Sequence, residues 1–289
     1  MTRVLVTGRT GQLGHSIAEL ADDPRFAALD LHVLSRTECD LADSGSIAGA
    51  IDRIDPAVII NAGAFTAVDA AETDQAAAFL ANRDGVADLA AASGRRLIQV
   101  STDYVFDGTK PEWYVESDPV APLGVYGQSK WQGEEAARTN PDHLILRTAW
   151  VYASHGHNFV KTMLRLGAER DRLRVVADQV GCPTSARDLA AALLALATAD
   201  LVGTFHLAGT EQATWHEFAV AIFHTAGLAV EVDAITTAEY PTPAPRPANS
   251  RLDSGALAEA TGIRLPGWRS SLPPVIDEIL TTDPIRTSP

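Results

Sequence analysis

Cysteine is nearly absent from the sequence, which has only Cys39 and Cys182, far apart and outside any C-x-x-C spacing. This content excludes a disulfide framework and a zinc knuckle, and it is typical of a reducing compartment. The apolar stretch Val4–Val6 near the N-terminus is too short for the core of a signal peptide. We therefore expect a cytoplasmic protein.

Long apolar runs are also lacking. The longest, Leu189 to Ala197, has nine residues, whereas a membrane span needs roughly twenty. The run predicts a buried helix segment, and we expect no membrane partner.

Positive charge is scarce, because 23 Lys and Arg face 37 Asp and Glu, a net charge of −14. This balance excludes the broad basic field that nucleic acids or anionic membranes require. An anionic ligand would have to be met by local positive groups. With 289 residues, 46% of them hydrophobic, the chain is long enough for one large domain or two modest ones.

The first half of the chain alternates short apolar runs with Ala-rich helical stretches. Strands are predicted at Arg3–Val6, Leu31–Leu34, Ala57–Ile60, Leu97–Val100 and Leu144–Leu146. Helices are predicted at Gln12–Ala21, Ser44–Ile54, Ala71–Ala92 and Tyr126–Arg138, with Ser44 as an N-cap and Gly94 as a C-terminal stop. Continuous apolar strands separated by helices indicate an α/β fold of the Rossmann type, a doubly wound parallel sheet covered on both faces.

The rhythm changes after about Trp150, where Gly and Pro become more frequent. We predict a dinucleotide-binding domain over residues 1–151 and a smaller C-terminal, mainly substrate-binding domain over 152–289, with a helix at about 186–199 returning to the first domain. Four prolines within Tyr240–Pro247 exclude a regular helix or central strand. This segment is either an extended linker or a loop that lines a substrate pocket.

Glycines recur every three residues directly after the first predicted strand. Gly8 permits a tight turn, Gly11 lets backbone N–H groups approach a pyrophosphate, and Gly14 lets the following helix pack closely on the strand. A P-loop would need Lys after its last glycine, but His15 follows Gly14. The position between a strand and a helix predicts dinucleotide binding.

The end of the second predicted strand indicates which dinucleotide is bound. NAD sites place an acid there, whereas NADP sites need a cation. The strand ends in Ser35 and Arg36, which can contact a 2′-phosphate. The sequence therefore predicts NADPH and leaves NADH open, and the alternative for Arg36 is a solvated surface arginine.

Tyr126 and Lys130 have the Y-x-x-x-K spacing, which places both side chains on one face of a helix. A nearby ammonium favours the phenolate, so we expect Lys130 to lower the pKa of Tyr126. Thr102 ends the fourth predicted strand and should open into the same crevice. Around a nicotinamide, these three groups would make a carbonyl reductase site, although a snorkelling lysine and a turn-capping threonine are the plainer alternatives.

Motifs along nearly the whole chain resemble those of the extended short-chain dehydrogenases/reductases, in the branch that acts on nucleotide-linked 4-keto-6-deoxysugars. They are TGRTGQLG from Thr7, NAGAFTAVDAAE from Asn61, STDYVFDGT from Ser101, YGQSKWQGE from Tyr126, RTAWVY from Arg147, NFVKTMLRL from Asn158, DQVGCPT from Asp178 and YPTPAPRPANSRLD from Tyr240. The resemblance implies NADPH-dependent reduction of the C4 ketone of a dTDP-linked 4-keto-6-deoxyhexose, giving dTDP-L-rhamnose.

The resemblance also implies roles for individual residues. Thr102, Tyr126 and Lys130 would be catalytic, and Thr102, Asp103 and Trp150 would contact the sugar. Asp40 would meet the adenine amino group and Leu41 would pack on the ring. The remaining cofactor contacts would come from Gly8, Thr10, Gly11, Gln12, Leu13, Gly14, Ala62, Gly63 and Ala64. Gly63 stands where this family usually has Ala, and Ser35 replaces the acid of members that accept NADH.

The substrate diphosphate needs donors from the second half of the chain. The candidates are Asn158, Lys161, Arg187, Arg246 and Arg251. We favour Arg246, because the surrounding prolines restrict the backbone and pre-organise the contact. Relatives can bind Mg²⁺, but the sequence shows no carboxylate cluster for it, so no metal ligand is predicted, and a homodimer remains open.

Two alternatives remain at this point. One is another enzyme on the same scaffold, a different deoxysugar 4-ketoreductase or a 4-epimerase. The other is a non-catalytic regulatory homologue, which would be expected to have lost Tyr126 or Lys130; both are present.

Overall fold

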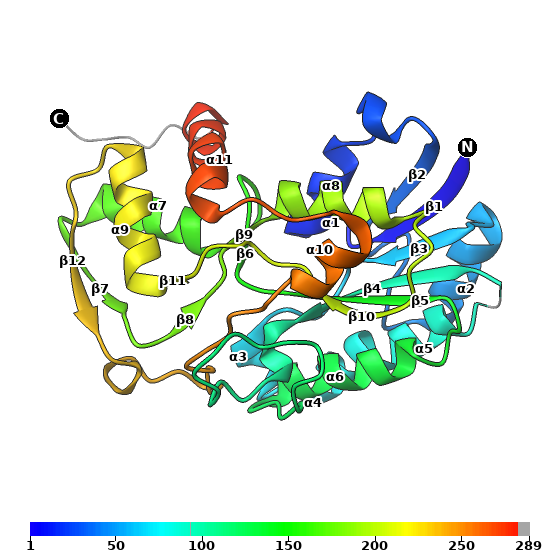
Figure 1. The fold of residues 1–289 in the computed structure, drawn as a ribbon, viewed down its shortest axis with the longest axis horizontal. Coiled ribbons are helices and arrows are strands. Elements are labelled where there is room, and N and C mark those ends of the chain that lie inside the picture. Colours follow the sequence, from blue (N-terminus) through cyan, green and yellow to red (C-terminus); the bar gives the residue numbers. More distant parts are fainter. Residues whose placement is uncertain (93, 283–289) are drawn as a thin grey trace.

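The central element of the fold is a six-stranded parallel sheet with strand order β2-β1-β3-β4-β5-β10 (Figure 1). A computed structural model describes residues 1–92 and 94–282, so residues 283–289 of the predicted second domain lie outside the described residues. The strands are β1 (Thr2–Thr7), β2 (Leu29–Leu34), β3 (Val58–Asn61), β4 (Arg96–Thr102), β5 (His143–Thr148) and β10 (Gly203–His206). The predicted doubly wound sheet is confirmed. β10 was not predicted, because this short edge strand begins at a glycine and is only partly buried.

Both faces of the sheet are covered, as the apolar strands require (Figure 1). Successive side chains of a strand point to opposite faces. Val4 and Val6 of β1 pack in one core with α1 (Gln12–Glu19) and α8 (Ala186–Leu196). Leu5 lies in the other core, with α2 (Ser44–Ile54), α5 (Gly85–Ala90) and α6 (Val125–Ala137).

Two helix ends differ from the sequence-based predictions. The N-cap of α2 is Asp43, whose carboxylate accepts the Gly45 N–H at 2.9 Å, and Ser44 is the first helical residue. The predicted helix stop at Gly94 is also wrong, since α5 ends at Ala90. Gly94 lies beyond the helix, with φ of 72°.

The single helix predicted over Ala71–Ala92 is interrupted. It consists of α3 (Val68–Ala71), α4 (Gln75–Phe79), a π-helical turn (Leu80–Asp84) and α5. Asp74 starts α4 by accepting the Ala77 N–H with its side chain. Such a carboxylate competes with the backbone for hydrogen bonds and favours a helix start over a helix interior.

A separate core lies beside the sheet (Figure 1). It is built from α7 (Phe159–Glu169), α9 (Trp215–Ala226), α11 (Trp268–Thr282) and the parallel pair β7 (Arg172–Val176) and β12 (Glu231–Ile235). No helix within residues 1–92 and 94–282 is long and apolar enough to cross a bilayer.

The chain crosses several times between the sheet and this separate core. After residue 151, α8 and β10 return to the sheet, and Leu257 of α10 (Gly255–Thr261) packs in the α1 core. The other short elements are β6 (Val151–Tyr152), β8 (Val180–Gly181), β9 (Thr184–Ser185), β11 (Ala213–Thr214) and the 3₁₀ turns at Pro24–Phe26, Asp103–Val105 and Thr237–Glu239. The domain boundary at residue 151 stays a prediction.

A buried carboxylate ties α6 to the sheet. Glu134 and Arg147 are almost fully buried, and the Arg147 guanidinium donates to both Glu134 oxygens, at 2.9 and 2.7 Å. The Ser101 hydroxyl donates to Glu134 at 2.6 Å. One side chain of α6 thus binds the ends of β4 and β5.

We predict that Glu134→Ala lowers the free energy of unfolding by about 3–5 kcal/mol, because it leaves the Arg147 charge buried without its partner. Urea denaturation measures this loss. The control is Glu169→Ala, which breaks the exposed Arg165–Glu169 pair and should cost less than about 1 kcal/mol. Equal losses in the two variants would contradict the prediction.

Candidate active site

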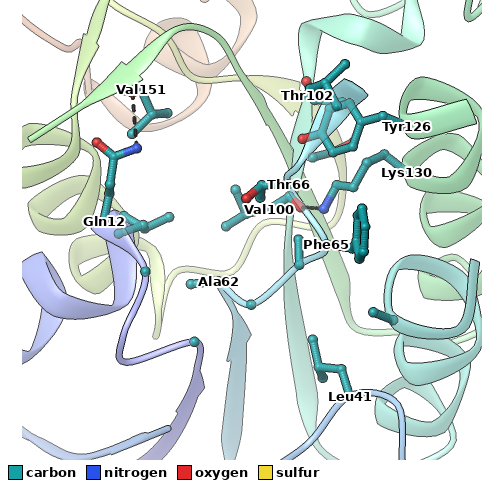
Figure 2. Close-up of a pocket in the computed structure, with 18 of the residues that line it drawn as sticks. Gln12, Leu41, Ala62, Phe65, Thr66, Val100, Thr102, Tyr126, Lys130 and Val151 are labelled. Carbon is teal, nitrogen blue, oxygen red and sulfur yellow. Dashed lines mark hydrogen bonds between the residues drawn. The ribbon is translucent and has the colours of Figure 1, made fainter. Parts of the chain in front are cut away.

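A crevice of about 930 Å³ opens beyond the carboxyl ends of the central strands. Its lining includes Gly8 after β1, Ala62 after β3 and Thr102 at the end of β4. Figure 2 shows Gln12 on one side of the crevice and Thr102, Tyr126 and Lys130 on the other. Ligands of open α/β sheets bind at this edge, where the strand order reverses between β1 and β3.

In the glycine turn the backbone of Gly8 packs closely against the start of α1, as a pyrophosphate site requires. Gly8 has φ of 84°, a left-handed value that favours glycine. A Cβ atom on Gly14 would lie 2.2 Å from the Gly8 carbonyl oxygen, so only glycine fits there. Gly8 and Gly11 line the crevice and Gly14 does not. Gly14 therefore serves helix packing, while the turn and the start of α1 face the ligand space.

Most of the predicted cofactor residues line this crevice. They are Gly8, Thr10, Gly11, Gln12, Leu13, Arg36, Asp40, Leu41, Ala62, Gly63, Ala64, Tyr126 and Lys130. A dinucleotide fits this set, because bare backbone at the turn and apolar side chains farther along suit phosphates and a base, respectively.

Ser35 does not take the predicted position. Its hydroxyl donates to Glu38 at 2.7 Å, and its N–H donates to the same carboxylate at 2.8 Å. These hydrogen bonds hold the pKa of Glu38 below its usual range. A charged carboxylate beside Ser35 would repel a phosphate, so this arrangement does not support the phosphate contact of Ser35, which stays a prediction.

Arg36 remains as the cation at this end of the crevice. It lines the crevice, is 78% exposed and makes an ion pair with Asp40 at 3.2 Å. Asp40 also accepts the Ala42 N–H, and these contacts lower its pKa. The contact between Glu38 and Ser35 was not predicted, because it depends on the conformation of the turn that follows β2.

Tyr126, Lys130 and Thr102 meet at the opposite end of the crevice (Figure 2). Tyr126 and Lys130 lie one turn apart on α6, as the spacing predicted. The Lys130 ammonium donates to the Val100 carbonyl at 2.7 Å. This bond fixes Lys130 beside the end of β4, which carries Thr102.

Burial controls the pKa values of this group. Desolvation raises the pKa of Tyr126 to about 12, against a lowering by the Thr102 hydroxyl. Desolvation also lowers the pKa of Lys130 to about 8, against the attraction of Glu134. The predicted lowering of the Tyr126 pKa is therefore wrong for the ligand-free site, because burial of the phenol outweighs nearby charge. The Tyr126 phenol is therefore protonated at neutral pH, the state that a proton donor requires.

Thr102 caps a turn and also faces the crevice. Its hydroxyl accepts the Tyr104 N–H and donates to Asp103 at 2.9 Å, so it caps a turn. It also lines the crevice beside Tyr126. Burial raises the pKa of Asp103 to about 6, so this buried carboxyl takes up a proton more readily than a solvated one.

Trp150 lies in the crevice in an unusual backbone conformation. Its φ is 47°, a left-handed value that is costly for a bulky residue and is common at functional sites. Its ring stacks on Trp215, with centroids 3.4 Å apart and planes 2° apart. A Cβ on Gly181 would come within 2.4 Å of the Trp150 ring, so this glycine makes room for the stack.

Trp215, Tyr104 and His157 also line the crevice, and none of them was predicted as a site residue. Trp215 is the first residue of α9, in the core beside the sheet, 65 positions after Trp150 in the chain. Only tertiary structure joins these residues, and no spacing signal could have paired them.

Arg246, the residue favoured for the substrate diphosphate, is engaged with other groups of the chain. Arg246 makes an ion pair with Asp69 at 2.9 Å and donates to the Ala244 carbonyl. It holds the proline-rich segment on α3, so that segment is a packed loop. Within the described part of the chain, Arg36 and Lys130 are the only Lys or Arg side chains in the crevice lining. Asn158, Lys161, Arg187, Arg246 and Arg251 are not part of that lining.

Comparison with known proteins agrees with this architecture. The family model of the RmlD substrate binding domain matches residues 1–281. The dTDP-4-dehydrorhamnose reductase of Sinorhizobium fredii is 46% identical over 284 residues, 93% of this chain and 95% of that protein. The chain belongs to the RmlD family of dTDP-4-dehydrorhamnose reductases.

Solved structures similar to this chain include both dTDP-4-dehydrorhamnose reductases and more distant proteins that share only the fold. An RmlD-family structure, dTDP-4-dehydrorhamnose reductase of Bacillus anthracis in complex with NADP, is 36% identical, has a TM-score of 0.91 and covers 96% of this chain and 100% of that one. UDP-glucose 4-epimerase of Thermus thermophilus, in complex with NAD, is 23% identical with a TM-score of 0.81 and covers 96% and 99% of the two chains. The second similarity shows the shared fold alone.

We predict that Gly14→Ala weakens NADPH binding at least tenfold and lowers the free energy of unfolding by about 1–3 kcal/mol, because the added methyl forces α1 away from the glycine turn. Fluorescence titration and thermal unfolding measure the two effects. Gly49→Ala in α2 is the matched control, since nothing lies within 4 Å of its added Cβ. That variant should gain roughly 0.5–1 kcal/mol, and binding unchanged in Gly14→Ala would contradict the prediction.

Proposed function

We propose that this protein reduces, with NADPH, the C4 ketone of dTDP-4-dehydro-6-deoxy-L-mannose to give dTDP-L-rhamnose. The observation that carries this proposal is the position of the Tyr126–Lys130–Thr102 group in the same crevice as the glycine turn. Family membership supports the substrate class, because the curated relatives carry the name dTDP-4-dehydrorhamnose reductase.

The glycine turn and Arg36 would hold the phosphates of the cofactor. Gly8 and Gly11 expose backbone at the start of α1, where partial positive charge meets a pyrophosphate. The exposed Arg36 side chain would exchange its ion pair with Asp40 for a contact with a 2′-phosphate. When bound, the reduced nicotinamide supplies the hydride for the ketone.

Tyr126 would donate its phenolic proton to the ketone oxygen as negative charge develops there. The raised pKa suits this direction of reaction, because the phenol stays protonated until the oxygen becomes basic. Lys130 stands one turn away and, in its charged form, would stabilise the phenolate left behind.

Thr102 would polarise the ketone. A hydroxyl has one proton, which Thr102 now gives to Asp103; it would turn this proton toward the ketone oxygen when substrate binds. Trp150, packed on Trp215 and lining the crevice, would form an apolar wall for the deoxysugar.

Replacing Tyr126 by Phe should lower kcat by about 10²–10⁴-fold, the usual contribution of a general acid. NADPH affinity should stay within about twofold, since the ring remains. Following NADPH oxidation with the dTDP-keto sugar, and identifying the C4 configuration of the product, tests both the reaction and the role.

Tyr240→Phe is the matched control, because Tyr240 is 60% exposed and should have wild-type activity. A Tyr126→Phe variant with more than a tenth of the wild-type rate would reject the acid role. A wild-type protein that interconverts sugars without consuming NADPH would instead be an epimerase, and one that does neither would be a non-catalytic homologue.

Arg36→Ala should raise the KM for NADPH roughly 10–100-fold and leave the KM for NADH nearly unchanged, because a charge-assisted contact is worth about 1.5–3 kcal/mol. Steady-state kinetics with both cofactors measures this. Arg165→Ala removes an exposed arginine of α7 as a control. A wild-type enzyme that strongly prefers NADH would overturn the assignment of NADPH.

A further inference from the structure

A cluster of two histidines and a glutamate lies outside the crevice. His15 and Glu19 are one turn apart on α1, and His155 comes from the segment between β6 and α7. None of the three lines the crevice. The reduction described above uses none of them.

The three side chains are close enough to share one ion. Each offers a ligand atom within 4.8 Å of the other two. The His15 Nε2 atom lies 3.5 Å from the Glu19 carboxylate, and the rings of His15 and His155 have centroids 3.8 Å apart. Since zinc holds each ligand at about 2.0–2.2 Å, small rotations of these side chains close the remaining distance.

A backbone hydrogen bond determines the tautomer of His155. Its Nε2 lies 2.9 Å from the Gln12 carbonyl oxygen, and a carbonyl can only accept. Neutral His155 therefore carries its proton on Nε2 and has a lone pair on Nδ1. Metal-binding histidines typically donate their other N–H to a carbonyl in this way.

We infer that His15, Glu19 and His155 form a binding site for a divalent transition metal such as Zn²⁺, with a further position open to water. Two imidazoles and one carboxylate are a common zinc ligand set. Mg²⁺ prefers oxygen ligands, so this site differs in chemistry from a magnesium site. The competing donors Cys39 and Cys182 are buried, and burial raises the pKa of each thiol.

The metal would join two parts of the crevice wall. Gln12 of α1 and Gly156 and His157 of the other segment line the crevice, and each is a close chain neighbour of a proposed ligand. At present α1 and this segment are joined by the His155 contact to the Gln12 backbone. An ion bound only by the folded state would add a link and stabilise the fold.

The test uses the full chain without a histidine tag, freed of metal by chelation. Equilibrium dialysis against Zn²⁺ and the visible spectrum of the Co²⁺ form measure binding. We expect one tight equivalent, a raised melting temperature and no competition from Mg²⁺. His15→Ala and His155→Ala should each weaken Zn²⁺ binding at least about tenfold.

His224→Ala is the matched control, because it removes an exposed histidine of α9 and should bind Zn²⁺ as the wild type does. Circular dichroism of the metal-free variants checks that they are folded. The inference is wrong if wild-type protein binds no Zn²⁺ near one equivalent. It is also wrong if folded His15→Ala and His155→Ala bind as tightly as the wild type, or if His224→Ala loses as much affinity as they do.

Discussion

The buried Glu134 carboxylate sets the geometry on which the candidate active site depends. It binds Arg147 near the end of β5 and Ser101 near the end of β4. It also lies on α6, the helix that carries Tyr126 and Lys130. A buried ion pair adds little net stability but penalises any other arrangement, since a separated charge would stay buried without a partner. The helix is thereby held in one register against the strand ends.

Desolvation governs the chemistry of the crevice more than its local charges do. The pKa of Tyr126 rises and that of Lys130 falls, each chiefly because the group is buried. The same effect raises the pKa of Asp103. A phenol that holds its proton suits reduction of a ketone, in which the enzyme must supply a proton. Oxidation would require the opposite state and a compensating charge from a ligand.

The glycine turn explains how a chain with a large negative net charge could bind anionic ligands. Net charge is −14, and in the described residues the crevice lining includes only Arg36 and Lys130 as Lys or Arg. Backbone N–H groups at the start of α1 carry no formal charge, yet they attract phosphates at short range. Because Gly14 packs directly against Gly8, the glycine turn lies close to the start of α1. The backbone N–H groups there would attract the phosphates without a patch of basic side chains.

Local patterns in the sequence determined the parallel sheet, the glycine turn and the Tyr126–Lys130 spacing, because each depends on neighbours a few residues apart. Tertiary structure decided the rest: the pairing of Trp150 with Trp215 and the edge strand β10. It also decided the sign of the Tyr126 pKa shift. These features depend on which distant segments exclude water from one another, and no spacing along the chain encodes that burial.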